Sequence, residues 1–289
     1  MSTVSKEFEE YILNDLKKYA GLIRPQKAKL IERILVRKAR PVNLHPNPED
    51  EFCDPKIGPN YGIVGKYVQY YVRRKGKAGA PRMEPLMVEK ITPRGYMILN
   101  GHHRWLAARR VNSRLLPIRI VNVTTEEEIQ EVLSRSENAV CASMDLDEVV
   151  LAKGASPKES RPWYAPGFLI RERVREGVPA LISELQRMGC DVWVYAGGYY
   201  STAYVNTLLK MYRVKVNGVV NGLRDKNRAR HLREEFRKKY VSSIHCDLES
   251  VTCVRTGTKE YDLTELTGSE GAWAAETIKA VRGMESVKK

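Results

Sequence analysis

Hydrophobic residues recur at helical spacing in the first part of the chain. One stripe is Phe8, Tyr11, Ile12 and Leu16, and a second is Leu30, Ile31, Ile34 and Leu35. Apolar positions three and four residues apart predict amphipathic helices, so we expect a helical segment over residues 1–38. Prolines then interrupt residues 41–60, and this punctuation predicts a polar loop.

Helices and short strands alternate between residues 61 and 133. Runs of apolar and β-branched residues mark the strands, whereas apolar positions at helical spacing mark the helices. The expected elements are a helix over 61–74, strands over 86–91 and 96–99, a helix from 101 to about 111, a strand over 116–123 and a helix over 126–133. This mixture predicts an α+β domain over residues 39–136.

The pattern changes near Glu137 to strands separated by long helices. We expect strands over 140–144, 192–195, 219–220 and 241–246, and helices over 171–188, 200–211 and 224–239. Strands that alternate with helices predict a parallel, doubly wound sheet, whose ligands bind at the carboxyl ends of the strands. The expected fold class is therefore α/β, with a Rossmann-like second domain over residues 137–289.

Composition fits a globular protein of two domains. Of the 289 residues, 43% are hydrophobic and 29% are charged, and no apolar run is long enough to span a bilayer. The five cysteines lie apart, which suits reduced thiols better than disulfides or a zinc site. Because the N-terminus shows no signal-peptide core, we expect a cytoplasmic protein without a membrane partner.

The net charge of +14 suits partners that carry phosphate. Lys and Arg gather in two stretches, residues 66–82 and 224–239. Such stretches bind nucleic-acid backbones and small phosphorylated ligands alike. In the second stretch Leu232, Phe236 and Tyr240 follow helical spacing, so its arginines are expected to form the solvated face of a helix that packs on the core.

A glycine turn joins the strand that ends at Leu99 to the next helix. The turn carries Asn100, Gly101, His102, His103 and Arg104. First-turn N–H groups of a helix favour an anion, and glycine lets a ligand approach the backbone. The imidazole and guanidinium groups add donors. We predict that these five residues bind a phosphate group or a nucleotide; the alternative is an ordinary turn with surface histidines.

Residues 39–123 resemble the ParB and sulfiredoxin superfamily. The Gly-His-His-Arg sequence at 101–104 is most similar to the free serine kinases of that fold. The resemblance implies that this box holds the phosphates of ATP, ADP or another nucleotide, and that an acidic residue of an earlier loop activates the serine hydroxyl. Glu49 is the first candidate for this acid, with Asp50 and Glu51 as alternatives.

The chain departs from the kinase pattern at Asn100. The kinases usually have Asp there, and an amide orients a hydroxyl but does not accept its proton. Phosphate binding does not depend on that proton transfer. The DNA-partition branch usually follows the box with a helix-turn-helix region, and the sequence after Val123 shows no such pattern.

A pair of carboxylates, Asp145 and Asp147, follows the strand expected over 140–144. Two carboxylates at the carboxyl edge of a parallel sheet suit phosphoryl transfer, because one attacks phosphorus and the other protonates the leaving oxygen. Mg²⁺ is the cofactor that would neutralise the facing charges. The spacing therefore predicts a site that acts on a phosphomonoester.

Residues from about 137 onward resemble the haloacid dehalogenase-like phosphatases. The similar segments are residues 163–167, with the sequence WYAPG, and residues 191–195, with the sequence DVWVY. The resemblance implies that Asp145 is the nucleophile and Asp147 the general acid and base. It further implies that Asp145, Asp147 and Asp247 hold Mg²⁺ and that Lys226 binds the phosphate.

The phosphatase pattern is incomplete at the end of its second strand. That family usually has Ser or Thr where this chain has Ala196, and a missing donor to the transition state typically costs about 10² to 10³ in rate. Main-chain N–H groups or Ser201 are the expected substitutes. A degenerate domain that binds without turnover is the alternative.

Three functional hypotheses follow. The first is a phosphoryl-transfer protein, with a nucleotide-binding first module and a Mg²⁺-dependent phosphatase module that acts on a small phosphorylated molecule. The second is a nucleic-acid-binding or partition-type protein that holds a phosphate backbone with its basic stretches. The third is a nucleotide-gated interaction protein in which both sites are catalytically inactive.

Overall fold

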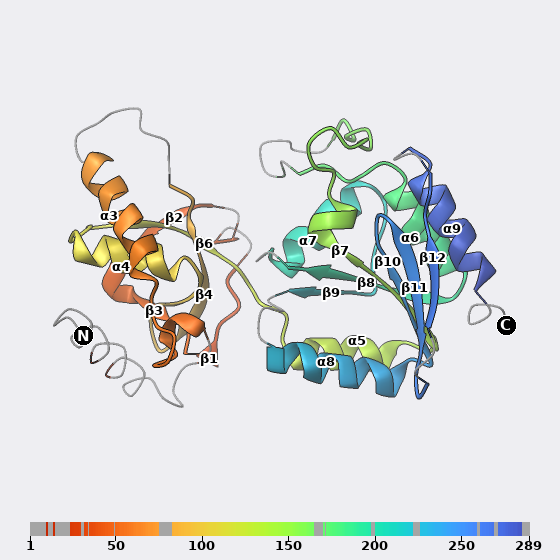
Figure 1. Ribbon diagram of the computed structural model, residues 1–289, viewed down its shortest axis with the longest axis horizontal. Coiled ribbons are helices and arrows are strands. Elements are labelled where there is room, and N and C mark those ends of the chain that lie inside the picture. The colour runs from red at the N-terminus through yellow and green to blue at the C-terminus, as the bar shows by residue number, and fades with distance from the viewer. Residues whose placement is uncertain are drawn as a thin grey trace. The chain divides into compact units, whose positions relative to one another are not determined.

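The computed structural model describes most of the chain and divides it into two compact units. The described residues are 10, 14, 24–29, 32–33, 35–48, 50–74, 83–164, 170, 172–197, 200–221, 226–258, 261–268 and 271–284. The first unit is residues 1–122 and the second is residues 123–289. Both combine a mixed sheet with helices (Figure 1), which confirms the α/β class.

The first unit is built on a six-stranded sheet. The strands run in the order β2-β6-β4-β5-β3, and β1 pairs with β4. Their bounds are β1 (Arg24–Pro25), β2 (Arg37–Ala39), β3 (Leu44–Pro46), β4 (Leu86–Thr92), β5 (Tyr96–Asn100) and β6 (Leu116–Ile120). The central strand β4 lies antiparallel to β5 and parallel to β6. Because β4 and β5 run in opposite directions, the carboxyl end of β5 lies beside the start of β4.

Two helices complete the described part of the first unit. They are α3 (Tyr61–Arg74) and α4 (His102–Arg110), which pack against each other. Leu86, Ile98 and Trp105 are fully buried in a hydrophobic core, and the indole N–H of Trp105 donates to the carbonyl oxygen of Pro41 at 2.9 Å. This core fixes α4 on the sheet directly after the β5 turn.

The second unit is built on another six-stranded sheet, in the order β12-β11-β10-β7-β8-β9. The strands are β7 (Val140–Asp145), β8 (Cys190–Ala196), β9 (Gly218–Asn221), β10 (Ser242–Cys246), β11 (Ser250–Arg255) and β12 (Tyr261–Glu265). Strands β9, β8, β7 and β10 are parallel, whereas β11 and β12 continue the sheet antiparallel. The predicted doubly wound sheet is therefore confirmed for its four parallel strands.

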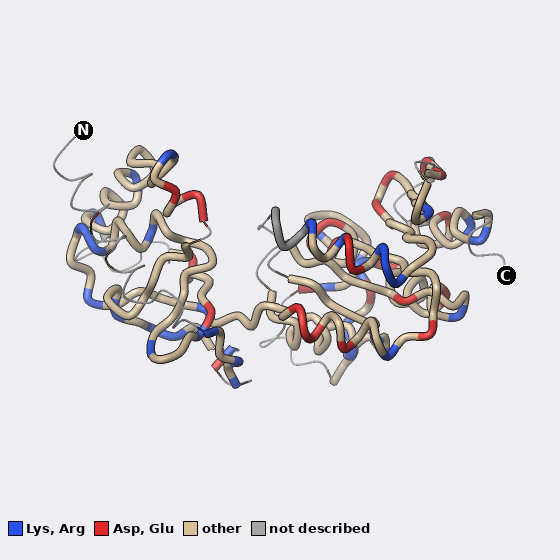
Figure 2. The backbone as a smooth tube through the Cα atoms, turned by 90° about the horizontal axis from the view of Figure 1, so that it is seen from below, with Lys and Arg blue, Asp and Glu red and all other residues tan. Residues whose placement is uncertain are grey.

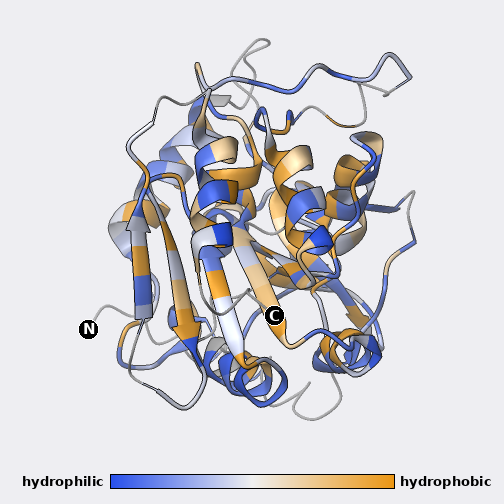
Figure 3. Cartoon of the chain, turned by 90° about the vertical axis from the view of Figure 1, so that its right-hand side faces the viewer, coloured by the Kyte–Doolittle hydropathy of each residue, from blue (hydrophilic) through white to orange (hydrophobic). Residues whose placement is uncertain are grey.

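Helices cover the second sheet through two separate hydrophobic clusters. They are α5 (Glu126–Arg135), α6 (Val178–Arg187), α7 (Thr202–Met211), α8 (Lys226–Lys239) and α9 (Trp273–Gly283). Helices α6, α7 and α9 contribute to the larger cluster, and α5 and α8 enclose Trp193 and Tyr240 in the smaller one. Figure 3 shows orange, hydrophobic residues concentrated in the strands and on the adjoining sides of the helices. The prediction that Leu232 and Phe236 face the core is confirmed.

Asp191, at the start of β8, is fully buried by a polar network. Its carboxylate accepts from the side-chain amides of Asn138 and Asn217, each at 2.8 Å, and from the hydroxyl of Tyr240 at 2.7 Å. The Trp193 indole N–H donates to the same hydroxyl at 3.0 Å. A buried carboxylate must be hydrogen-bonded to be tolerated, so this network anchors the amino end of β8 in the sheet.

The helix predicted over residues 171–188 is shorter in the structure. It begins at Val178 because Gly177, with φ 82°, adopts the left-handed conformation that ends the preceding extended segment. Val174 and Arg175 form bridges with Leu151 and Lys158 instead. The expectation of helix before Gly177 is therefore wrong.

Other elements were not predicted or fall elsewhere. Residues 41–60, expected as a loop, include the short buried strand β3, and strands β11 and β12 and helix α9 were not expected. The units separate after Asn122, so α5 belongs to the second unit, although the predicted boundary lay near Glu137. The helix with Phe8 and Leu16 falls outside the described residues. Among the described helices, none is long and apolar enough to cross a membrane.

Candidate functional sites

The predicted phosphate box lies on the turn between β5 and α4. Gly101 precedes the helix with φ 108°, a conformation that favours glycine. A Cβ atom there would lie 3.0 Å from Cγ of Leu86 and 3.1 Å from Nη2 of Arg104. The sharp turn aims the first-turn N–H groups of α4, from His102, His103 and Arg104, outward along the helix axis. The turn has the backbone geometry that an anion requires.

Both histidines accept main-chain hydrogen bonds. Nε2 of His102 accepts from the N–H of Asn47 at 3.2 Å, and Nε2 of His103 accepts from the N–H of Asn60 at 3.0 Å. An imidazole that accepts at Nε2 carries its proton on Nδ1. The two rings therefore bind the ends of segment 47–60 in this conformation, and Nδ1–H of His103 is the ring donor that faces away from this bond.

The segment between these two hydrogen bonds packs on the box. The Phe52 ring stacks on His102 with centroids 5.1 Å apart and meets His103 edge-on at 5.2 Å. Oδ1 of Asp50 accepts from the N–H of Phe52 at 2.9 Å, and its Oδ2 lies 3.4 Å from Nδ1 of His102. Asp50, one of the alternatives for the acid, is thus placed at the box. Glu49 lies outside the described residues.

Arg104 folds back onto the chain. The residue is 7% exposed, and its Nη1 donates to the carbonyl oxygens of Glu84 at 2.7 Å and Pro85 at 3.4 Å. Glu84 adds an ion pair at 3.6 Å. In this conformation the guanidinium fixes the entry to β4, and a phosphate contact by Arg104 stays a prediction.

Burial keeps the histidines neutral. It lowers the pKa of His102 to about 4, against the opposing effect of the Asp50 carboxylate, and His103 lowers it further. Burial also lowers the pKa of His103, and Asp50 again opposes the shift. Neutral rings are required by the hydrogen bonds to Asn47 and Asn60, since an imidazolium has no acceptor.

The second predicted site lies where β7 ends. Asp145 terminates the strand, and its Oδ1 accepts from the N–H groups of Asp147 at 2.7 Å and Glu148 at 3.0 Å. These bonds cap a single π-helical turn, Leu146–Val150. Because Oδ1 is held by two main-chain donors, the orientation of the carboxylate is fixed and Oδ2 points elsewhere.

Oδ2 of Asp145 and Oδ2 of Asp147 both lie close to Gly197. A Cβ atom at Gly197 would lie 3.8 Å from Oδ2 of Asp147 and 3.9 Å from Oδ2 of Asp145. Gly197 directly follows β8, the parallel neighbour of β7. The structure therefore brings the two predicted catalytic carboxylates together beside Gly197, the residue that follows Ala196.

Other predicted residues of this site join less closely. Asp247 follows β10, whose last residue Cys246 pairs with Met144, but Oδ1 of Asp247 accepts from the N–H of Leu248 at 2.7 Å. Among the described residues, no three His, Cys, Asp or Glu side chains are grouped to hold a metal ion. Lys226 begins α8, and its side chain lies outside the described part of the chain.

Ala196 and Ser201 were predicted to matter for the transition state. Ala196 is fully buried at the end of β8, and Ser201 is buried as the residue that precedes α7. The methyl of Ala196 offers no donor, and the next residue, Gly197, is the one that lies beside the carboxylates. The role of Ser201 stays a prediction.

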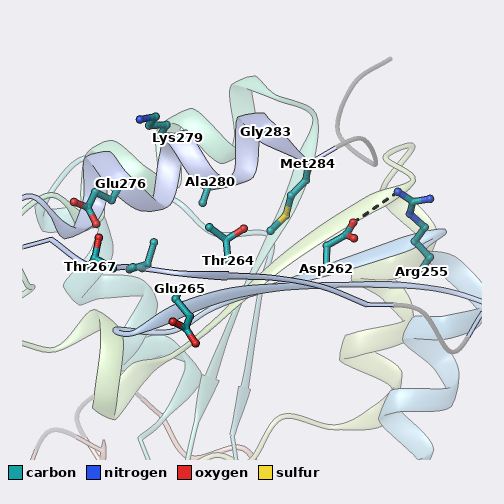
Figure 4. Close-up of a pocket in the computed structure, with 11 residues that line it drawn as sticks. Arg255, Asp262, Thr264, Glu265, Thr267, Glu276, Lys279, Ala280, Gly283 and Met284 are labelled. Atoms are coloured by element: carbon teal, nitrogen blue, oxygen red, sulfur yellow. Dashed lines mark ion pairs between the residues drawn. The ribbon is translucent and has the colours of Figure 1, made fainter.

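Two hollows in the second unit lie away from these residues. One, of about 720 Å³, lies between β12 and α9 and is lined by Asp262, Thr264 and Lys279 among others (Figure 4). The other, of about 630 Å³, lies between α5 and α8. Neither hollow is lined by a residue of the predicted sites. The candidate sites are therefore identified by the chemistry of the two turns and not by the volume of a cavity.

The neutral state of His102 predicts a pH-dependent stability. Its folded pKa of about 4 lies below the ordinary 6.5, so the unfolded chain binds the proton more tightly and stability falls as the pH drops from 6.5 toward 4. Between pH 7 and pH 5 this single group should remove about 2 kcal/mol of the free energy of unfolding. Urea denaturation of the wild type and of His102→Gln at both pH values measures the difference.

The exposed His245 provides the control. His245→Gln removes an imidazole without touching the box. If His102→Gln shows the same loss of stability between pH 7 and pH 5 as the wild type, buried His102 is not the cause.

Comparison with known proteins finds similarity in the segment that carries the first predicted site. Residues 78–138 match the ParB N-terminal domain, a segment that includes the whole box. A search of the curated proteins found no match. A solved structure, the C-terminally truncated chromosome-partitioning protein ParB from Caulobacter crescentus complexed with CTP-gamma-S, is 24% identical over 36% of this chain and 56% of that chain, with a TM-score of 0.24.

The similarity covers only part of each protein. The chain spans about half the length of that structure. Neither comparison supports the resemblance to serine kinases or to haloacid dehalogenase-like phosphatases. The segment from 78 to 138, which contains the glycine turn and both histidines, is similar to the ParB N-terminal domain.

Proposed function

We propose that the first unit binds a phosphate group of a nucleotide at the N-terminus of α4. The observation that carries the proposal is the left-handed Gly101 turn inside a segment that matches the ParB N-terminal domain. The N–H groups of His102, His103 and Arg104 supply the donors, and the helix dipole adds to their attraction for an anion. The amide of Asn100 and Nδ1–H of His103 are side-chain groups that we expect beside that phosphate.

ATP, ADP or another nucleotide is the ligand class that we propose. A kinase step at this site would need a base for the hydroxyl of the acceptor. Asp50 is better supported than Glu49 for that role, because its carboxylate lies 3.4 Å from His102 in the box. Asn100 offers only an amide, so binding is better supported than transfer.

A nucleic-acid role is less well supported by the second basic stretch. Helix α8 carries exposed Arg230, Arg233 and Arg237, but Glu234 lies among them. Gln130 of α5 bonds to Glu235, and Glu126 of α5 lies 3.8 Å from His231. Figure 2 shows Lys and Arg interleaved with Asp and Glu along these helices. A phosphate backbone would meet both signs of charge there.

Nucleotide binding tests the first proposal. Titration calorimetry with ATP, ADP, GTP and CTP should detect binding, and Gly101→Ala should weaken it at least about tenfold, because a Cβ strains the φ of the turn and displaces Arg104. Gly154→Ala is the matched control, since Gly154 also has positive φ but has nothing within 4 Å of an added Cβ.

The outcomes separate the hypotheses. Equal weakening by both substitutions in folded proteins would contradict a ligand at the turn. No nucleotide binding by the wild type, together with binding to DNA that weakens steeply with salt, would favour the nucleic-acid alternative.

The second unit supports a second candidate function, hydrolysis of a small phosphomonoester. The supporting observation is the convergence of Oδ2 of Asp145 and Oδ2 of Asp147 on Gly197. The sheet order and the resemblance to haloacid dehalogenase-like phosphatases agree with this proposal. Mg²⁺ would neutralise charge between the carboxylates and the phosphate, and one or two carboxylates with waters and phosphate oxygens meet its usual needs.

The two aspartates have separate roles in the proposed reaction. Oδ2 of Asp145 bonds to phosphorus as the bond from phosphorus to the leaving oxygen breaks. Asp147, protonated at the start, gives its proton to that oxygen. It then takes a proton from the water that attacks the aspartyl phosphate, which releases phosphate and restores Asp145.

Turnover of p-nitrophenyl phosphate with Mg²⁺ tests the second proposal. Asp145→Asn should reduce kcat at least about 10³-fold, because it removes the nucleophile. Asp262→Asn, which changes an exposed carboxylate of β12, should leave turnover unchanged. A wild type that binds nucleotide but hydrolyses no phosphomonoester would favour the degenerate, nucleotide-gated alternative.

A further inference from the structure

The last carbonyl groups of the π-helical turn after β7 need donors from elsewhere in the chain. The turn spans Leu146–Val150, and the N–H of Leu151 donates to the carbonyl of Leu146 at 2.9 Å. In a turn this short, the last carbonyls have no following helix to donate to them. Buried main-chain groups of this kind need another donor if the turn is to keep its shape.

Arg175 supplies donors to three consecutive carbonyls of this turn. Its Nη2 donates to the carbonyl of Glu148 at 3.2 Å, its Nε to that of Val149 at 3.0 Å, and its main-chain N–H to that of Val150 at 2.9 Å.

Arg175 is almost completely enclosed. It is 4% exposed, and among the described residues it forms no ion pair with a carboxylate. Burying a guanidinium without a carboxylate partner is unfavourable unless its donors are satisfied and its charge serves a neighbouring negative group. The guanidinium bonds to the turn that carries Asp147 and Glu148 and that is capped by Asp145.

We infer that Arg175 is the positioning residue that holds Asp145 and Asp147 in their working geometry. The fork of the guanidinium fixes Glu148 and Val149, and these residues fix the N–H groups of Asp147 and Glu148 that hold Oδ1 of Asp145. The buried positive charge also favours anions at the same end of β7. The role of Arg175 in catalysis rests on the proposed phosphoryl transfer, whereas its role in holding the shape of the turn does not.

Hydrogen exchange and kinetics on the same variants test this inference. In Arg175→Gln, the amides of Asp147 and Glu148 should exchange at least about tenfold faster than in the wild type, while the amide of Val194 in the neighbouring strand stays protected. The kcat for p-nitrophenyl phosphate should fall at least about tenfold with KM changed less than about twofold, because geometry of the reacting groups rather than binding is lost. Arg175→Lys keeps the charge without the fork and should fall between the two.

Arg173→Gln is the matched control. Arg173 lies on the same extended segment, and its Nη2 donates to the carbonyl of Glu159 rather than to the turn. Unchanged protection of Asp147 and Glu148 in folded Arg175→Gln, or wild-type behaviour of Arg175→Lys in both measurements, would overturn the inference. The inference is also overturned if Arg173→Gln changes amide exchange and kcat as much as Arg175→Gln does. If the wild type shows no turnover, the proposed reaction fails, and the amide exchange still decides the role of Arg175.

Discussion

The need to bond main-chain groups in tight turns shapes both candidate sites. Each site lies where a strand ends and the backbone turns sharply, and each turn is buried on its inner side. Buried N–H and C=O groups without partners are strongly unfavourable, so side chains must bond to them. In the first unit the two histidines of the turn accept N–H groups from the neighbouring segment 47–60. In the second an aspartate accepts N–H groups of the turn while an arginine donates to its carbonyls.

Because of this constraint, the polar side chains of both sites make hydrogen bonds to the main chain. His102 and His103 each use Nε2 on segment 47–60, and Arg104 uses its guanidinium on the carbonyls before β4. The anion-binding capacity of the first turn then comes mainly from the backbone of α4. At β7 the same logic leaves one oxygen of Asp145 bound to the turn and the other directed at Gly197.

Much of the fold was predictable because burial leaves a pattern in the sequence. Strand β8 is buried along almost its whole length, β7 is buried at Cys141, Ala142 and Met144, and the stripe of α8 packs as predicted. The start of α6 was mistaken because apolar spacing continues from Val174 through Gly177 even though the backbone there is extended. Strand β12 escaped prediction because every residue in it is exposed.

The sites were less predictable than the fold. The sequence located both turns, since glycine after a strand and carboxylates after a strand are local signals. The partners of those residues are not local: Asn47 and Asn60 lie far from the histidines along the chain, and Arg175 lies far from the π-helical turn. Which ring nitrogen accepts, and which arginine supports the aspartates, depends on tertiary packing that no spacing rule encodes.

The central claim is that the backbone N–H groups of α4 bind the ligand while Nε2 of both histidines stays bonded to segment 47–60. Long-range proton–nitrogen NMR spectra of the histidine rings at pH 7, with and without nucleotide, test it most directly. The account predicts unprotonated Nε2 in both histidines under both conditions, while the amide signals of His102, His103 and Arg104 shift on binding. Protonation of either Nε2 when nucleotide binds, with those amide signals unmoved, would contradict it.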